Sequence, residues 1–151
     1  MSGLVLSTEE DFVDLITGAT FYGTGGGGTP EEGMRLLRKE ADAGRKIQCV
    51  DPESIPDDTW TVSVSFMGNR APLTDAQKEK TVNLGLNQWK FENNLVEAAR
   101  LLEEHTQCRI EAFVVPELGG ANTPGLMAAG IHMGIPVVDG DYSGRAIPEI
   151  A

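Results

Sequence analysis

Cysteine is scarce in this chain, with only Cys49 and Cys108 among 151 residues. Two cysteines that form no C-x-x-C pair are too few for a disulfide framework and do not match a zinc-binding spacing. Apolar residues never run for the roughly 18 positions that a membrane-spanning helix requires. The first ten residues also lack the basic start and the long apolar segment of a secretory signal peptide. The sequence therefore predicts a cytoplasmic protein without a membrane partner.

Positive charge is also scarce, because 12 lysine and arginine residues face 23 aspartate and glutamate residues. The net charge is −11 at pH 7, and no cluster of basic residues interrupts the acidic excess. Proteins that bind nucleic acid use lysine and arginine to replace the counterions of the phosphates. The composition therefore excludes a nucleic-acid partner. It does not identify a substrate, because acidic surfaces are mostly only solvated.

Strand and helix signals alternate along the chain and predict one α/β domain. Ser7 and Glu10 have the spacing of a capping box before a helix that Gly18 can end, and Thr29-Pro30 marks the start of a second helix. Such alternation indicates a mostly parallel or mixed sheet flanked by helices. The expected helices cover 8–17, 30–43, 92–105 and a segment from 123; the expected strands cover 46–50, 60–66, 109–115 and 135–140, with a loop or weak helix at 67–87.

Glycine is the residue present in excess, and it is concentrated in residues 23–28. This run matches the dinucleotide pattern G-x-G-x-x-G, but that pattern needs a strand before its first glycine, and here a helix precedes it. No Gly-Lys-Ser/Thr follows, so a Walker loop is excluded. We therefore predict no nucleotide cofactor. Two uses of the run remain open: tight packing that needs positive φ, or a cradle of N–H groups for a carboxylate or an oxyanion.

Two further glycine-bearing loops follow predicted strands, at the sheet edge where α/β proteins bind ligands. In the first, Glu117 is a candidate general base or an ordinary surface glutamate. In the second, Asp139 and Asp141 begin a D-x-D-x-S-G sequence that matches the first half of a calcium loop. Ile150 stands where such a loop needs glutamate, so we expect a site for an ion or a polar ligand rather than an EF-hand. Arg145 is available there to neutralise a carboxylate.

Three segments of the chain together resemble a known family. They are residues 18–37, the sequence PELGGAN at 116–122, and GIPVVDGDYSGRAIPE at 134–149. They resemble the N-terminal domain of the S-methyl-thiohydantoin desulfurase-like family, which is associated with hydantoinases and oxoprolinases. The resemblance covers roughly residues 9–149. It implies hydrolysis of a small cyclic-amide-like substrate, at a ring carbonyl or thiocarbonyl of a cyclic imide or thiohydantoin.

The resemblance also implies which residues form the site. Backbone N–H groups of the glycine loops would stabilise an oxyanion, and a carboxylate would activate water. A water bound to a divalent metal is the competing nucleophile. The residues expected to be catalytic are Glu117, Asp139 and Asp141, and those expected to bind substrate are Thr24, Gly25, Gly26, Gly27, Gly28, Gly119, Gly120, Asn122, Gly144, Arg145 and Glu149.

Family members usually continue into a second domain, whereas this chain stops at Ala151, directly after a candidate site motif. We therefore expect the N-terminal domain of a larger two-domain hydrolase, with a site completed by a missing domain or a partner subunit. We do not expect this chain to catalyse a reaction alone, and we expect it to form a homo-oligomer. The alternative is a non-catalytic ligand-binding or assembly module that uses the same loops.

Overall fold

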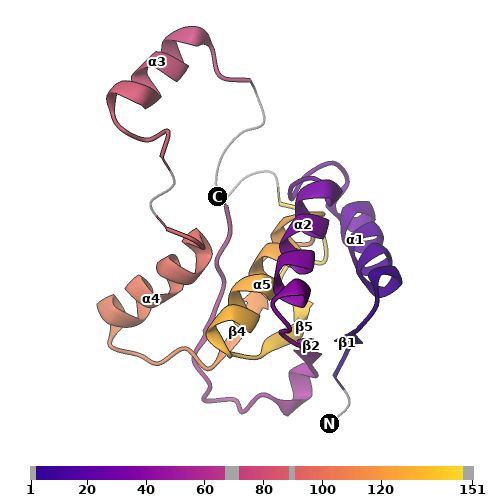
Figure 1. Ribbon diagram of the computed structural model, residues 1–151. Coiled ribbons are helices and arrows are strands. Elements are labelled where there is room, and N and C mark those ends of the chain that lie inside the picture. Colours follow the sequence, from indigo (N-terminus) through magenta and orange to yellow (C-terminus); the bar gives the residue numbers. More distant parts are fainter. Residues whose placement is uncertain (1–2, 67–71, 89–90, 148–151) are drawn as a thin grey trace.

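The computed structural model describes residues 3–66, 72–88 and 91–147 (Figure 1). Helices and strands alternate along most of the chain, as the sequence predicts, and none of the described helices has the length and apolarity to cross a membrane. The elements in chain order are β1 (Val5–Leu6), α1 (Glu9–Gly23), α2 (Pro30–Asp42), β2 (Ile47–Val50), η1 (Pro52–Ser54), β3 (Thr61–Val62), α3 (Asp75–Asn83), α4 (Asn94–Thr106), β4 (Ala112–Val115), α5 (Asn122–Met133) and β5 (Val137–Asp141).

The strands form one mixed sheet in the order β1-β2-β5-β4-β3. Strands β2, β5, β4 and β3 are parallel, and β1 joins the edge antiparallel to β2. The predicted α/β domain with a mostly parallel sheet is confirmed. The carboxyl ends of the four parallel strands therefore lie along one edge of the sheet, which is where open α/β sheets bind ligands.

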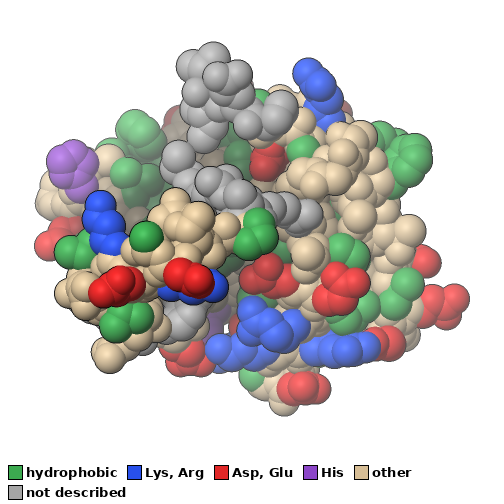
Figure 2. Space-filling view, turned by 90° about the horizontal axis from the view of Figure 1, so that it is seen from above, with side chains coloured by type: hydrophobic (Ala, Val, Ile, Leu, Met, Phe, Trp, Pro, Cys, Tyr) green, Lys and Arg blue, Asp and Glu red, His purple; other side chains and the backbone are tan. Residues whose placement is uncertain are grey.

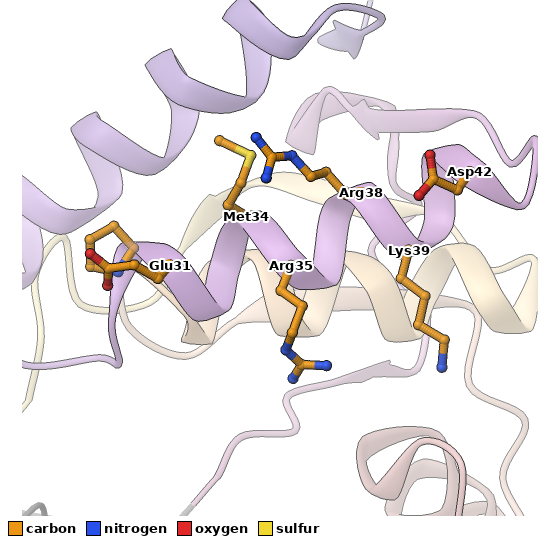
Figure 3. Close-up of a pocket in the computed structure, with 7 residues that line it drawn as sticks. Glu31, Met34, Arg35, Arg38, Lys39 and Asp42 are labelled. Carbon is orange, nitrogen blue, oxygen red and sulfur yellow. The ribbon is translucent and has the colours of Figure 1, made fainter.

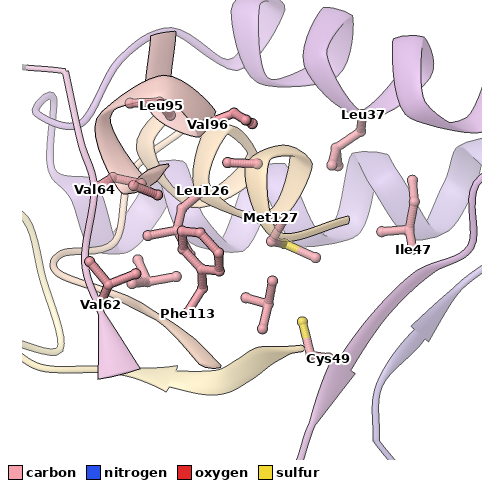
Figure 4. Packing of buried hydrophobic residues seen from close by; sticks show 14 of the residues in the cluster. Leu37, Ile47, Cys49, Val62, Val64, Leu95, Val96, Phe113, Leu126 and Met127 are labelled. Carbon is pink, nitrogen blue, oxygen red and sulfur yellow. The ribbon is translucent and has the colours of Figure 1, made fainter. Parts of the chain in front are cut away.

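One face of the sheet carries the main hydrophobic core, and four helices cover it (Figure 4). Phe113 of β4 is fully buried against Leu126 and Met127 of α5, the most buried helix of the fold. Helices α1, α2 and α4 pack around α5 and add their own apolar faces. The opposite face of the sheet holds a smaller cluster of Ala112, Val114 and Val138. The fold is thus built around α5, and its N-terminus lies at the ligand edge of the sheet.

Helix α1 begins one residue later and ends six residues later than the sequence predicts. Thr8, not Ser7, is the N-cap, because its hydroxyl accepts from the N–H of Asp11 and the Asp11 carboxylate accepts from the Thr8 N–H. The expected stop at Gly18 is wrong, and the helix continues to Gly23. Its buried residues, from Phe12 to Gly23, follow helical spacing along one face, so tertiary packing overrides the weak propensity of a glycine.

Helix α2 begins as predicted, with Thr29 as N-cap and Pro30 at the first position. The predicted start of α5 at Thr123 is wrong. Asn122 is the first residue of α5, and its N-cap Ala121 has no side chain that can cap the helix. The Thr123 hydroxyl instead accepts a hydrogen bond from the Gly119 N–H at 3.2 Å. The N-terminus of α5 must therefore be capped by another part of the chain.

The close packing of α2 on the β4–α5 loop yields a test with a matched control. A Cβ added at Gly33 would lie 1.9 Å from the carbonyl oxygen of Gly120, whereas a Cβ at Gly18 would meet nothing within 4 Å. Both glycines lie within helices. We predict that Gly33→Ala lowers the free energy of unfolding by about 3 kcal/mol, and that Gly18→Ala raises it by up to about 1 kcal/mol. Urea unfolding of the two variants checks both values, and equal effects would contradict the packing.

Candidate functional site

Three loops meet at the carboxyl edge of β4 and β5, and we call them together the loop edge. They are the glycine loop between α1 and α2 (residues 23–28), the β4–α5 loop (116–121) and the segment after β5 (142–147). The sequence predicts ligand-binding residues in all three. Hydrogen bonds and close backbone contacts join each loop to at least one of the others. The structure therefore brings most of the predicted site residues into one region.

The glycine loop begins with Thr24, which ends α1 in the left-handed conformation, with φ 47°. Its N–H donates to the carbonyl oxygen of Phe21 at 3.1 Å. The Gly26 N–H then donates to the Gly23 carbonyl oxygen at 2.7 Å and closes a tight turn. Helix α1 leads directly into the loop, where a dinucleotide fold would have a strand.

Gly27 and Gly28 carry the closest contacts of this loop. A Cβ on Gly27 would lie 2.5 Å from the Cα of Gly119, and a Cβ on Gly28 would lie 2.2 Å from the Cβ of Ala121. Both glycines have positive φ, 71° and 88°. The Gly27 carbonyl oxygen accepts from the N–H groups of Ala121 and Asn122, both at 2.9 Å. The glycine loop thus caps the N-terminus of α5, and the packing use of the glycine run holds at these positions.

The other side of the same peptides leaves room for a ligand. Among the described residues, no protein group accepts a hydrogen bond from the N–H groups of Gly27 and Gly28. A Cβ on Gly25 would meet no atom within 4 Å, so the loop is open there. At Gly26 the Ala146 side chain of the third loop lies close. The packing use of the run is thus observed, and its use as a cradle stays a prediction.

Glu117 joins the second and third loops. One carboxylate oxygen, Oε1, accepts from Asn122 Nδ2 at 2.7 Å, and the other, Oε2, accepts from the backbone N–H of Ile147. The side chain is half-buried. A carboxylate that accepts hydrogen bonds at both oxygens is fixed in place. In the chain as described, both carboxylate oxygens of Glu117 hold the loops together.

Asp141 also hydrogen bonds to its own loop. Its Oδ1 accepts from the N–H of Ser143 at 2.9 Å and from the N–H of Gly144, which forms an Asx turn. The Ser143 hydroxyl donates to the Pro116 carbonyl oxygen at 2.8 Å and so ties the third loop to the second. Ser143 was not predicted as a site residue, although the Asp-x-Ser-Gly sequence is typical of such a turn. Asp141 and Ser143 together shape the loop edge.

Three predicted residues are not drawn into this network. Asp139 is exposed on β5 and lies beside Cys49 of β2, whose pKa its charge helps to raise. Arg145 is exposed, and only its backbone oxygen takes part, accepting from Ser143 Oγ at 2.8 Å. Glu149 lies outside the described residues. Within residues 3–66, 72–88 and 91–147, no group of three or more His, Cys, Asp or Glu side chains could hold a metal ion.

Two hollows in the described part of the chain lie along α2 rather than at the loop edge. The larger, of about 730 Å³, follows the exposed face of α2 from Pro30 to Asp42 (Figure 3). The smaller, of about 340 Å³, lies between α2 and the start of α4 and includes Phe66 and Phe91. Basic and acidic side chains are interspersed on the face of the molecule in Figure 2. None of the residues that line these two hollows belongs to the loop edge.

The chain is similar to known proteins in sequence and in structure. The family model described as S-Me-THD-like, N-terminal domain, matches residues 10–151. A crystal structure of a protein from Chromobacterium violaceum, from the Northeast Structural Genomics Consortium, is similar with a TM-score of 0.69 and 30% sequence identity. The similarity covers 97% of this chain and 37% of that chain, so this chain spans little more than a third of the relative's length. A search of curated proteins found no significant match.

The environment of Cys49 predicts an unreactive thiol. Burial, and to a lesser extent the charge of Asp139, raise its pKa to about 12. Cys108 is less buried. A raised pKa keeps the thiol protonated, and only the thiolate reacts. At about pH 8.5, where an ordinary thiol is half ionised, iodoacetamide should modify Cys108 and leave Cys49 unmodified until urea unfolds the chain. Peptide mass spectrometry reads both sites, and rapid labelling of Cys49 in the folded protein would contradict the packing.

Proposed function

The chain belongs to the S-Me-THD-like N-terminal domain family, and we propose that it forms part of a hydantoinase-like hydrolase. The proposed substrate is a small cyclic imide or thiohydantoin, which binds at the loop edge. The proposed reaction is addition of water to a ring carbonyl or thiocarbonyl carbon. The observation that carries the proposal is the meeting of three loops at the carboxyl edge of parallel strands, with N–H groups left over for a ligand.

The N–H groups of Gly27 and Gly28 are the candidate oxyanion donors. Packing against Gly119 and Ala121 holds both glycines in place, and the Gly27 carbonyl, which shares its peptide with the Gly28 N–H, caps α5. Donors that are already fixed need no reorganisation when negative charge develops on a ring oxygen or sulfur in the transition state. A cyclic imide also has carbonyl groups to which such donors hydrogen bond in the ground state.

The three predicted catalytic carboxylates have different roles in this proposal. Glu117 and Asp141 accept hydrogen bonds from backbone N–H groups or from Asn122, so they position the loops. Asp139 is exposed and hydrogen bonds to no other described residue, and it is the carboxylate to which we assign the activation of water. Since the described residues offer no fitting set of metal ligands, we derive no step that depends on a metal.

The site is proposed to be complete only when another domain or subunit covers the loop edge. The loop edge is open, and large apolar side chains beside it are exposed, among them Phe21, Tyr22 and Tyr142. Hydrolytic sites exclude bulk water so that electrostatic interactions act at full strength. The solved relative has a chain of which this one covers 37%, which supports a completing domain. Turnover is therefore assigned to the completed protein.

A non-catalytic module that holds a carboxylated ligand is the second candidate. Glu117 and Asp141 accept hydrogen bonds from loop N–H groups, so two of the three predicted catalytic carboxylates have a structural role. This observation favours the second candidate. The same N–H groups of the glycine loop would bind a carboxylate as readily as an oxyanion. The two candidates differ in the ligand that binds and in the effect of removing the charge of Asp139.

We predict that this chain binds hydantoin and 5-benzylhydantoin without hydrolysing them. In a 15N-labelled sample, titration should shift the amide signals of Gly27 and Gly28 more than those of any residue of α2. The Asp139→Asn variant should bind as the wild type does, because Asp139 acts on water and not on the ring. Chromatography of the same samples checks that no ring-opened product forms.

The control ligand is the ring-opened product, an N-carbamoyl amino acid, which carries a carboxylate that the ring lacks. Binding of this product alone, without binding of either ring, would favour the non-catalytic module. Shifts confined to the hollow beside α2 would contradict a site at the loop edge. Loss of ring binding in Asp139→Asn would contradict the assignment of Asp139 to water.

A further inference from the structure

We draw no further inference here: the strongest candidate, the hollow of about 340 Å³ between α2 and the start of α4, is lined by charged side chains that already pair with one another or with Arg45, and nothing in the structure shows which ligand it would hold.

Discussion

The carbonyl oxygen of Gly27 is the acceptor on which the arrangement of this domain depends. It receives the N–H groups of Ala121 and Asn122 and so caps the central buried helix, which has no capping side chain of its own. The backbones can approach this closely only because glycine stands at Gly27 and Gly119, where a Cβ would collide with the opposite chain. One interaction therefore fixes the start of α5, the path of the glycine loop and the edge of the sheet where a ligand would bind.

Local signals in the sequence predict local structure well. The alternation of strands and helices gives the fold class, and Thr29 followed by Pro30 predicts the start of α2 because that cap is complete within four residues. The failures occur where distant residues decide. Gly18 does not end α1, since burial of the residues after it keeps the helix intact, and Thr123 does not cap α5, since its hydroxyl accepts from the Gly119 N–H instead. No spacing rule contains these contacts.

In the candidate site, too, local signals are predicted from the sequence and contacts between distant residues are not. The sequence predicts three glycine-bearing loops, two of them at the ends of strands, and the structure brings the three together. The sequence does not predict which side of each peptide faces the neighbouring loop. It also does not predict that both carboxylate oxygens of Glu117 accept hydrogen bonds from neighbouring residues of the site. From the sequence alone, a carboxylate between a strand and a glycine turn is equally consistent with a general base and with a residue that holds loops together. In the proposed hydrolase, Glu117 holds the loops together and the glycine loop binds the ring.

Hydrogen exchange of the Ala121 and Asn122 amides tests the central interaction most directly. If the Gly27 carbonyl caps α5, both amides should exchange as slowly as those in the middle of the helix, because they open only when the glycine loop separates from it. Exchange as fast as that of an exposed loop amide would show that the glycine loop does not hold the helix, and the account of the loop edge built on that contact would be wrong.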